Sequence, residues 1–167
     1  MAQVSDDTLA KISTDAATEF VQSFYPALQS SRATIASYYA PTTSKILFNG
    51  NIVADGPSVQ EIFTKQMPPA RYEVQSYDCQ IINLNYPGLA SSSRPSGTAL
   101  AKNMSLLVTV SGYVAFGESS REPRELANRG FSETFVLVPN PQAEAGGPKA
   151  RGRKQWLIQS QNFRLVV

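Results

Sequence analysis

The sequence contains no histidine among its 167 residues, and this absence narrows the chemistry open to the protein. Histidine is the usual general base near neutral pH and the commonest metal ligand in proteins. The single cysteine, Cys79, excludes an internal disulfide and leaves too few thiolates for a zinc centre. We therefore expect no metal site, no cofactor and no catalysis that depends on histidine.

Strong charge and long apolar stretches are missing as well. The formal net charge is only +2, whereas sequence-independent binding of nucleic acid calls for a larger excess of Lys and Arg over Asp and Glu. No apolar run approaches the length that spans a bilayer, and the first residues lack the pattern of a signal peptide. With 42% apolar residues, the chain has the composition of a globular protein. We expect one soluble, intracellular domain over residues 1–167, without membrane insertion.

Three helices are predicted in the first part of the chain. The first follows a capping Ser5, and Pro26 is expected to kink or end it. A second short helix is predicted for residues 32–39 and a third for residues 57–66, where a proline occupies the first helical position. The first helix carries an apolar stripe at helical spacing, formed by Leu9, Ile12, Ala16, Phe20 and Phe24.

Strands dominate the rest of the sequence. Asn49-Gly50 predicts a tight turn between strands at 45–48 and 52–54, because both residues tolerate positive φ. Longer strands are predicted at 71–83, 103–116, 130–138 and 155–166. Long loops near 85–102 and 139–154 are rich in Ser, Pro and Gly. Helices followed by a meander of strands indicate an α+β fold.

The strand predicted at 103–116 has two distinct faces. One face is apolar, and the other carries Leu107, Thr109, Ser111, Tyr113 and Ala115 without any charge. A sheet surface that faces solvent usually carries Lys or Glu, so we expect another molecule to cover this face. Within the strand predicted at 71–83, Asp78 stands among uncharged neighbours, and a lone carboxylate on such a face needs a partner.

Six segments, in this order along the chain, resemble the nuclear transport factor 2-like proteins and, more closely, the small subunit of the heterodimeric messenger-RNA export receptor. The resemblance implies a cone-shaped fold in which three helices pack on a strongly curved antiparallel sheet. The segments are Phe48-Asn49-Gly50-Asn51, Ser58-Val59-Gln60-Glu61-Ile62-Phe63, Tyr77-Asp78-Cys79-Gln80, Gly112-Tyr113-Val114-Ala115-Phe116, Arg129-Gly130-Phe131-Ser132-Glu133-Thr134-Phe135 and Phe163-Arg164-Leu165.

The resemblance also implies a function. The protein would be a non-catalytic adaptor that forms a heterodimer, through its open sheet face, with the large subunit of the mRNA export receptor. It would support export of messenger ribonucleoprotein from the nucleus through the nuclear pore and shuttle to the cytoplasm. Phe-Gly repeats of nucleoporins would bind mainly to the large subunit. Asp78 would pair with an arginine of the partner, and Arg164 with an acid.

Further candidate residues come from strand alternation and from charge. Alternation alone adds Thr109, Ser111, Tyr113, Ser160 and Asn162 to the predicted partner interface. A basic tract near the end of the second long loop is the candidate for weak, salt-sensitive RNA contact, with a solubilising loop as the alternative interpretation. This tract consists of Lys149, Arg151, Arg153 and Lys154.

Two alternative functions stay open. A homodimeric carrier of a small GTPase would need a hydrophobic cavity rimmed with acids, which residues 83–102 do not offer. A pocket enzyme of the same fold would need a carboxylate in a deep pocket, with a raised pKa, set against hydroxyl donors. The absence of histidine disfavours this second alternative.

Overall fold

The computed structural model describes residues 5–84, 86, 103–117, 128–143 and 153–166. Most of the two segments predicted as long loops, and Lys149 and Arg151 with them, lie outside these residues. In chain order, the elements are α1 (Asp6–Ser30), the 3-10 helix η1 (Arg32–Tyr38), β1 (Lys45–Phe48), β2 (Asn51–Val53), α2 (Gly56–Glu61), the π-helical turn η2 (Ile62–Gln66), β3 (Ala70–Asn83), β4 (Ser105–Phe116), β5 (Asn128–Pro139) and β6 (Trp156–Leu165).

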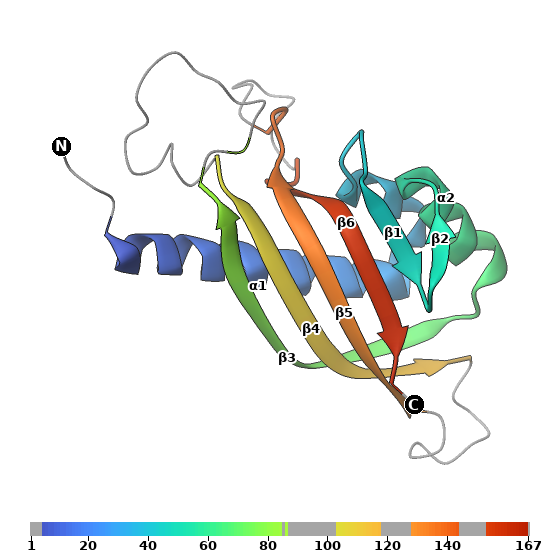
Figure 1. Ribbon diagram of the computed structural model, residues 1–167. Helices are drawn as coiled ribbons and strands as arrows, with labels where there is room; N and C mark the ends of the chain where they lie inside the picture. Colours follow the sequence, from blue (N-terminus) through green and yellow to red (C-terminus); the bar gives the residue numbers. More distant parts are fainter. Residues whose placement is uncertain (1–4, 85, 87–102, 118–127, 144–152, 167) are drawn as a thin grey trace.

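The strands form one open sheet with the order β2-β1-β6-β5-β4-β3. All neighbours are antiparallel except β1 and β6, which run parallel. Figure 1 shows α1 crossing behind the bent sheet, with α2 beside β1 and β2. The predicted α+β fold, with three helical segments on one side of a curved and mostly antiparallel sheet, is confirmed. No helix among the described residues is long and apolar enough to cross a membrane.

The first helix runs further than the sequence predicts. Ser5 caps it by accepting a hydrogen bond from the Thr8 backbone N–H at 3.3 Å. Of the two outcomes expected at Pro26, a kink or an end of the helix, the end is wrong, because α1 continues to Ser30. Pro26 itself is exposed, but Tyr25, Ala27 and Leu28 around it are buried. This tertiary packing offsets the cost of the missing backbone hydrogen bond.

Aromatic side chains fill the space between α1 and the sheet. Phe20 and Phe24 of α1 contact Phe135 of β5, with ring centroids 4.9 and 5.4 Å apart respectively. On β4 the apolar face predicted from the sequence is buried, whereas Thr109 and Tyr113 on the other face are exposed. The concave side of the sheet therefore holds the core, and the convex side is turned away from the helices (Figure 1).

Arg32 fastens the second and third helical segments to the end of α1. Its guanidinium donates hydrogen bonds to the carbonyl oxygens of Leu28, Phe63 and Met67, each at 2.9 Å, and of Pro68 at 2.7 Å. Carbonyl groups at the end of a helical turn lack partners within the helix, and a planar guanidinium can satisfy several of them at once. The arrangement fixes where η2 ends.

The hairpin turn forms as predicted. Asn49 and Gly50 have φ angles of 49° and 83°, the left-handed conformation that a two-residue hairpin turn requires at both positions. Asn49 Oδ1 also accepts a hydrogen bond from the Leu165 backbone N–H at 2.8 Å, which ties the turn to the end of β6.

A bulge near Gln75 bends β3 beside Gly112, where an added Cβ would collide with the Glu73 carbonyl oxygen.

Candidate partner interface on the convex face of the sheet

A row of polar side chains crosses the convex face of the sheet. Asp78 of β3 pairs with Thr109 of β4, which pairs with Thr134 of β5, which in turn pairs with Asn162 of β6. Because directly paired residues point to the same side of a sheet, these four side chains lie in one line. Thr134 was not among the residues predicted for the interface, although alternation along β5 indicates this face for it.

Two further rows run beside the first. One contains Ser76, Ser111, Ser132 and Arg164, and the other contains Gln80, Leu107, Val136 and Ser160. The hydroxyl oxygens of Ser76 and Ser111 lie 2.8 Å apart and share a hydrogen bond. Across β3 to β6, the three rows carry small polar and aliphatic side chains and only two charges, those of Asp78 and Arg164.

The structure places all seven residues predicted for the partner interface on this face. Tyr113 is 46% exposed. Ser111 and Ser160 are half-buried, and the Ser160 hydroxyl donates to the Lys45 carbonyl at 3.0 Å. The other predicted residues, all exposed, are Asp78, Thr109, Asn162 and Arg164. Their contact with a partner stays a prediction.

Asp78 lies beside a hollow of about 290 Å³ that Cys79, Gln80, Leu107 and Thr109 also line. Its Oδ1 accepts a hydrogen bond from the Cys79 backbone N–H at 2.8 Å. The neighbouring Tyr77 points to the opposite side of β3, where its hydroxyl lies 3.0 Å from that of Thr18 on α1. Asp78 forms no ion pair within the described part of the chain, so its carboxylate is available to a cation from outside.

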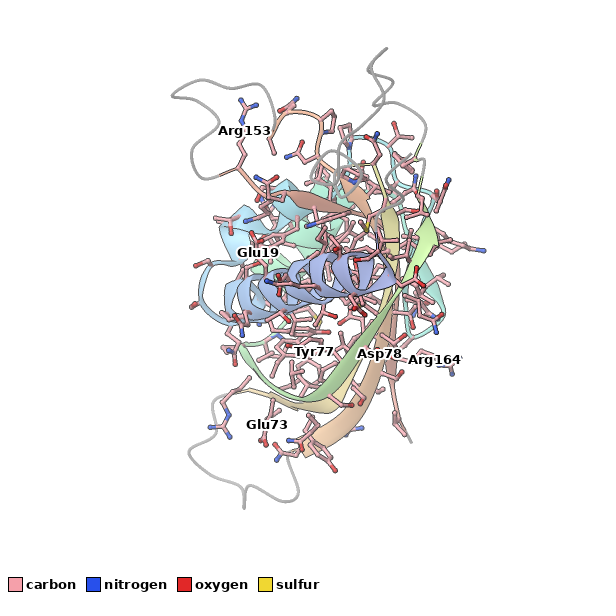
Figure 2. All side chains as sticks on the ribbon, turned by 90° about the vertical axis from the view of Figure 1, so that its left-hand side faces the viewer. Glu19, Glu73, Tyr77, Asp78, Arg153 and Arg164 are labelled. Carbon is pink, nitrogen blue, oxygen red and sulfur yellow. The ribbon has the colours of Figure 1, made fainter. Side chains whose placement is uncertain are left out.

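Asp78 and Arg164 do not neutralise each other. Two strands, β4 and β5, separate β3 from β6. At the usual strand spacing, three steps across the sheet amount to roughly 14 Å. Figure 2 shows Arg164 projecting on the side of the sheet away from α1. The three rows thus present two separated charges of opposite sign.

Of the predicted basic tract, only Arg153 and Lys154 are among the described residues. Arg153 Nη1 donates to the Gln142 carbonyl at 3.0 Å, and Lys154 Nζ lies 3.6 Å from the centre of the Tyr38 ring. In Figure 2, Arg153 lies on the side of Glu19 and α1, away from Arg164. These two cations are therefore not part of the convex face.

The burial of one carboxyl group, that of Glu133, was not predicted from the sequence. It accepts hydrogen bonds from the Tyr25 hydroxyl and from Gln161 Nε2, both at 2.6 Å, and Gln161 in turn accepts one from the Tyr39 hydroxyl. Burial raises the pKa of Glu133 to about 7, against the opposing effect of these two hydrogen bonds. The signal was present, because alternation on β5 places Glu133 on the same face as Phe131 and Phe135.

An apolar pocket of about 410 Å³ opens between the hairpin, η2 and the ends of β3, β4 and β6. Its walls include Phe48, Phe63 and Phe116, and its polar lining residues are Asn49, Asn51 and Tyr72. Among the described residues, no acid lines this pocket, so the rim that a GTPase carrier would need is not found there. Glu133, whose pKa is raised, does not line it either.

A bent, open sheet with helical segments on one side defines the class of domains called nuclear transport factor 2-like. Residues 16–164 match the "Nuclear transport factor 2 (NTF2) domain" family, and the chain belongs to this family.

Within it, the chain is similar to proteins of messenger-RNA export. It is 27% identical over 138 residues to "NTF2-related export protein 1" of Bos taurus, covering 83% of each chain. It resembles a chain of "Sac3N peptide bound to Mex67:Mtr2" with 26% identity and a TM-score of 0.76, covering 93% of this chain and 99% of that one. For "Chaetomium thermophilum Mex67 NTF2-like domain complexed with Mtr2", the identity is 27% and the TM-score 0.73, with the same coverage. The predicted resemblance to the export subunit is confirmed.

Proposed function

We propose that the protein is a non-catalytic adaptor that forms a heterodimer with the large subunit of the mRNA export receptor and supports export of messenger ribonucleoprotein through nuclear pores. The observation that carries the proposal is the convex face of the sheet, which no helix covers among the described residues. The similarity to Mtr2, which is found in complexes with Mex67, supports this choice of partner.

The chemistry of the convex face suits a protein partner. Small side chains in straight rows allow another sheet to approach closely, and exposed Tyr113 supplies apolar area with a polar tip. The hollow beside Asp78 would receive a basic side chain from the partner, and Arg164 would meet an acid. Such charge pairs contribute mainly to orientation and partner choice.

The same charges disfavour a homodimer. A homodimer in which Asp78 of each copy met uncharged residues of the other copy would bury this carboxylate without a cation. An unpaired buried carboxylate costs several kcal/mol, roughly, in real proteins. Partner choice then follows from a penalty against the wrong partner as much as from attraction to the right one.

The proposed adaptor would act in the nucleus and at the nuclear pore and shuttle to the cytoplasm. Phe-Gly repeats would bind mainly to the large subunit. Weak RNA contact through the tract that contains Lys149, Arg151, Arg153 and Lys154 fits this arrangement. Because Arg153 lies on the side of α1, it would stay exposed when the convex face is occupied (Figure 2).

Co-expression with candidate large subunits, followed by measurement of the mass of the complex, tests the proposal. We expect a one-to-one heterodimer, and we expect Asp78→Arg to abolish it without unfolding the chain. Glu19→Arg, the same change on the exposed surface of α1, is the matched control and should leave the heterodimer intact. Co-purification that survives Asp78→Arg removes the assignment of Asp78, and a stable homodimer without a large subunit refutes the adaptor.

A further inference from the structure

The apolar pocket described above is preorganised. Arg32 holds Phe63, Met67 and Pro68, which form one wall, through three of its hydrogen bonds. On the other side, Asn49 ties the hairpin to β6. At about 410 Å³ the pocket falls within the range of ligand sites, roughly 300–1,000 Å³. A preformed cavity of this kind binds a ligand without the loss of conformational entropy that ordering its walls would cost.

Each of the two asparagines that line the pocket uses only one atom of its side-chain amide, either the oxygen or the nitrogen, in a hydrogen bond to a described residue. Asn49 uses Oδ1 to accept from Leu165, and its Nδ2 has no partner among the described residues. Asn51 uses Nδ2 to donate to the Phe48 carbonyl at 3.1 Å, and its Oδ1 is similarly without a partner there. The two asparagines therefore offer one free donor and one free acceptor beside an apolar cavity. A peptide group, which offers both a carbonyl and an N–H, matches this pair.

The free edge of the sheet borders the same pocket. β2 is the terminal strand of the sheet (Figure 1). Its residues Asn51 and Val53 line the pocket. Phe48 pairs with Asn51 across a two-residue turn, so the backbone N–H and C=O of Ile52 point away from β1. Ile52 is 73% exposed, and no hydrogen bond joins its backbone to another described residue beyond the hairpin.

From these features we propose that the protein binds a short extended peptide that adds to the edge of β2 and inserts one large apolar side chain into the pocket. A peptide residue bonded to Ile52 would point to the convex side, as Ile52 does. The residues before and after it would point to the concave side, next to Asn51 and Val53, which is where the pocket opens. The inserted side chain is aromatic or large aliphatic, because the lining carries no charge.

The site is separate from the proposed partner interface. The pocket lies on the concave side of the sheet, whereas the three rows that carry Asp78 and Arg164 lie on the convex side. A peptide and a heterodimer partner can therefore bind at the same time. A compact lipophilic molecule would fill the cavity but would leave the edge of β2 unused, and this difference separates the two kinds of occupant.

The test uses the full chain and a capped seven-residue peptide with one central phenylalanine between threonine and serine residues. The same peptide with alanine in place of phenylalanine is the matched control. Calorimetry should show affinity lower by about ten-fold or more for the alanine peptide, the value of burying one large apolar side chain. In nuclear magnetic resonance spectra, the phenylalanine peptide should shift the Ile52 amide signal and protect it from exchange.

Protein variants complete the test. Val53→Trp fills the pocket from β2 and should weaken peptide binding by about ten-fold or more. If this variant does not fold, Met67→Trp fills the pocket from the residue that follows η2, and the same loss of affinity is expected. Leu47→Trp, on the convex face of the same hairpin, should leave the affinity within about two-fold. Equal binding of the two peptides, or binding that Val53→Trp leaves unchanged, overturns the proposal. If toluene binds and neither peptide shifts the Ile52 amide signal, the proposal of a peptide site is wrong and the pocket is a site for small apolar molecules.

Discussion

The buried Glu133 makes the stability of the fold depend on pH. The pKa of this carboxyl group rises from its ordinary value of 4.5 to about 7 in the folded protein. The folded state therefore holds a proton that the unfolded state releases, and stability falls as the pH rises between these two values. At 1.36 kcal/mol per pKa unit, this difference corresponds to roughly 3 kcal/mol. That stability is fully present below pH 4.5 and is lost once the pH exceeds about 7.

Glu133→Gln removes the titrating proton and keeps the shape of the side chain. The amide oxygen can still accept from Tyr25, and Gln161 can turn its own amide to face the new one. Urea unfolding at pH 5, 6, 7 and 8 should show a free energy of unfolding that falls by roughly 2 to 3 kcal/mol in the wild type and stays flat in the variant. Glu19→Gln, an exposed carboxyl on α1, is the control and should retain the wild-type slope.

Equal pH dependence in the wild type and Glu133→Gln would refute this reasoning. It would mean that Glu133 is ionised in the folded protein throughout this range. The hydrogen bonds from Tyr25 and Gln161 would then stabilise the carboxylate by as much as burial destabilises it, and the direction of the pKa shift would be wrong.

Two further predictions concern arginine and lysine side chains. Arg32→Lys should lower the free energy of unfolding by at least about 2 kcal/mol, because an ammonium group cannot reach four carbonyl oxygens at once. Arg71→Lys, on the exposed edge of β3, is the control. Equal urea midpoints for the two variants would contradict the prediction. Replacing both Arg153 and Lys154 with alanine in the heterodimer should reduce the salt dependence of RNA retention, with a change in slope of about 1 to 2. An unchanged profile across the salt series would make these residues bystanders.

Local patterns in the sequence predicted most of the fold. Asn49-Gly50 predicted the hairpin because positive φ at two successive positions is a local requirement. Alternation on β4 predicted both faces of that strand, and the same alternation placed Thr109, Ser111 and Tyr113 on the convex side. Such features depend on neighbours within a few residues, and they are therefore legible without the structure.

Features that depend on distant partners were not predicted. Glu133 is stable in the core because of Tyr25 and Gln161, which are 108 and 28 residues away along the chain. The continuation of α1 past Pro26 and the hydrogen bonds of Arg32 to η2 are likewise products of tertiary packing. The apolar pocket is assembled from several elements, so no single stretch of sequence announces it.

The position of β6 has a consequence for synthesis. This strand lies between β1 and β5, although the other described strands all precede it in the chain. While the polypeptide emerges from the ribosome, the hairpin of β1 and β2 has no sheet to join and both facing edges stay unpaired. Non-local pairing of this kind slows folding and exposes the nascent chain to aggregation. Insertion of β6 between β1 and β5 should therefore be a late step in forming the sheet.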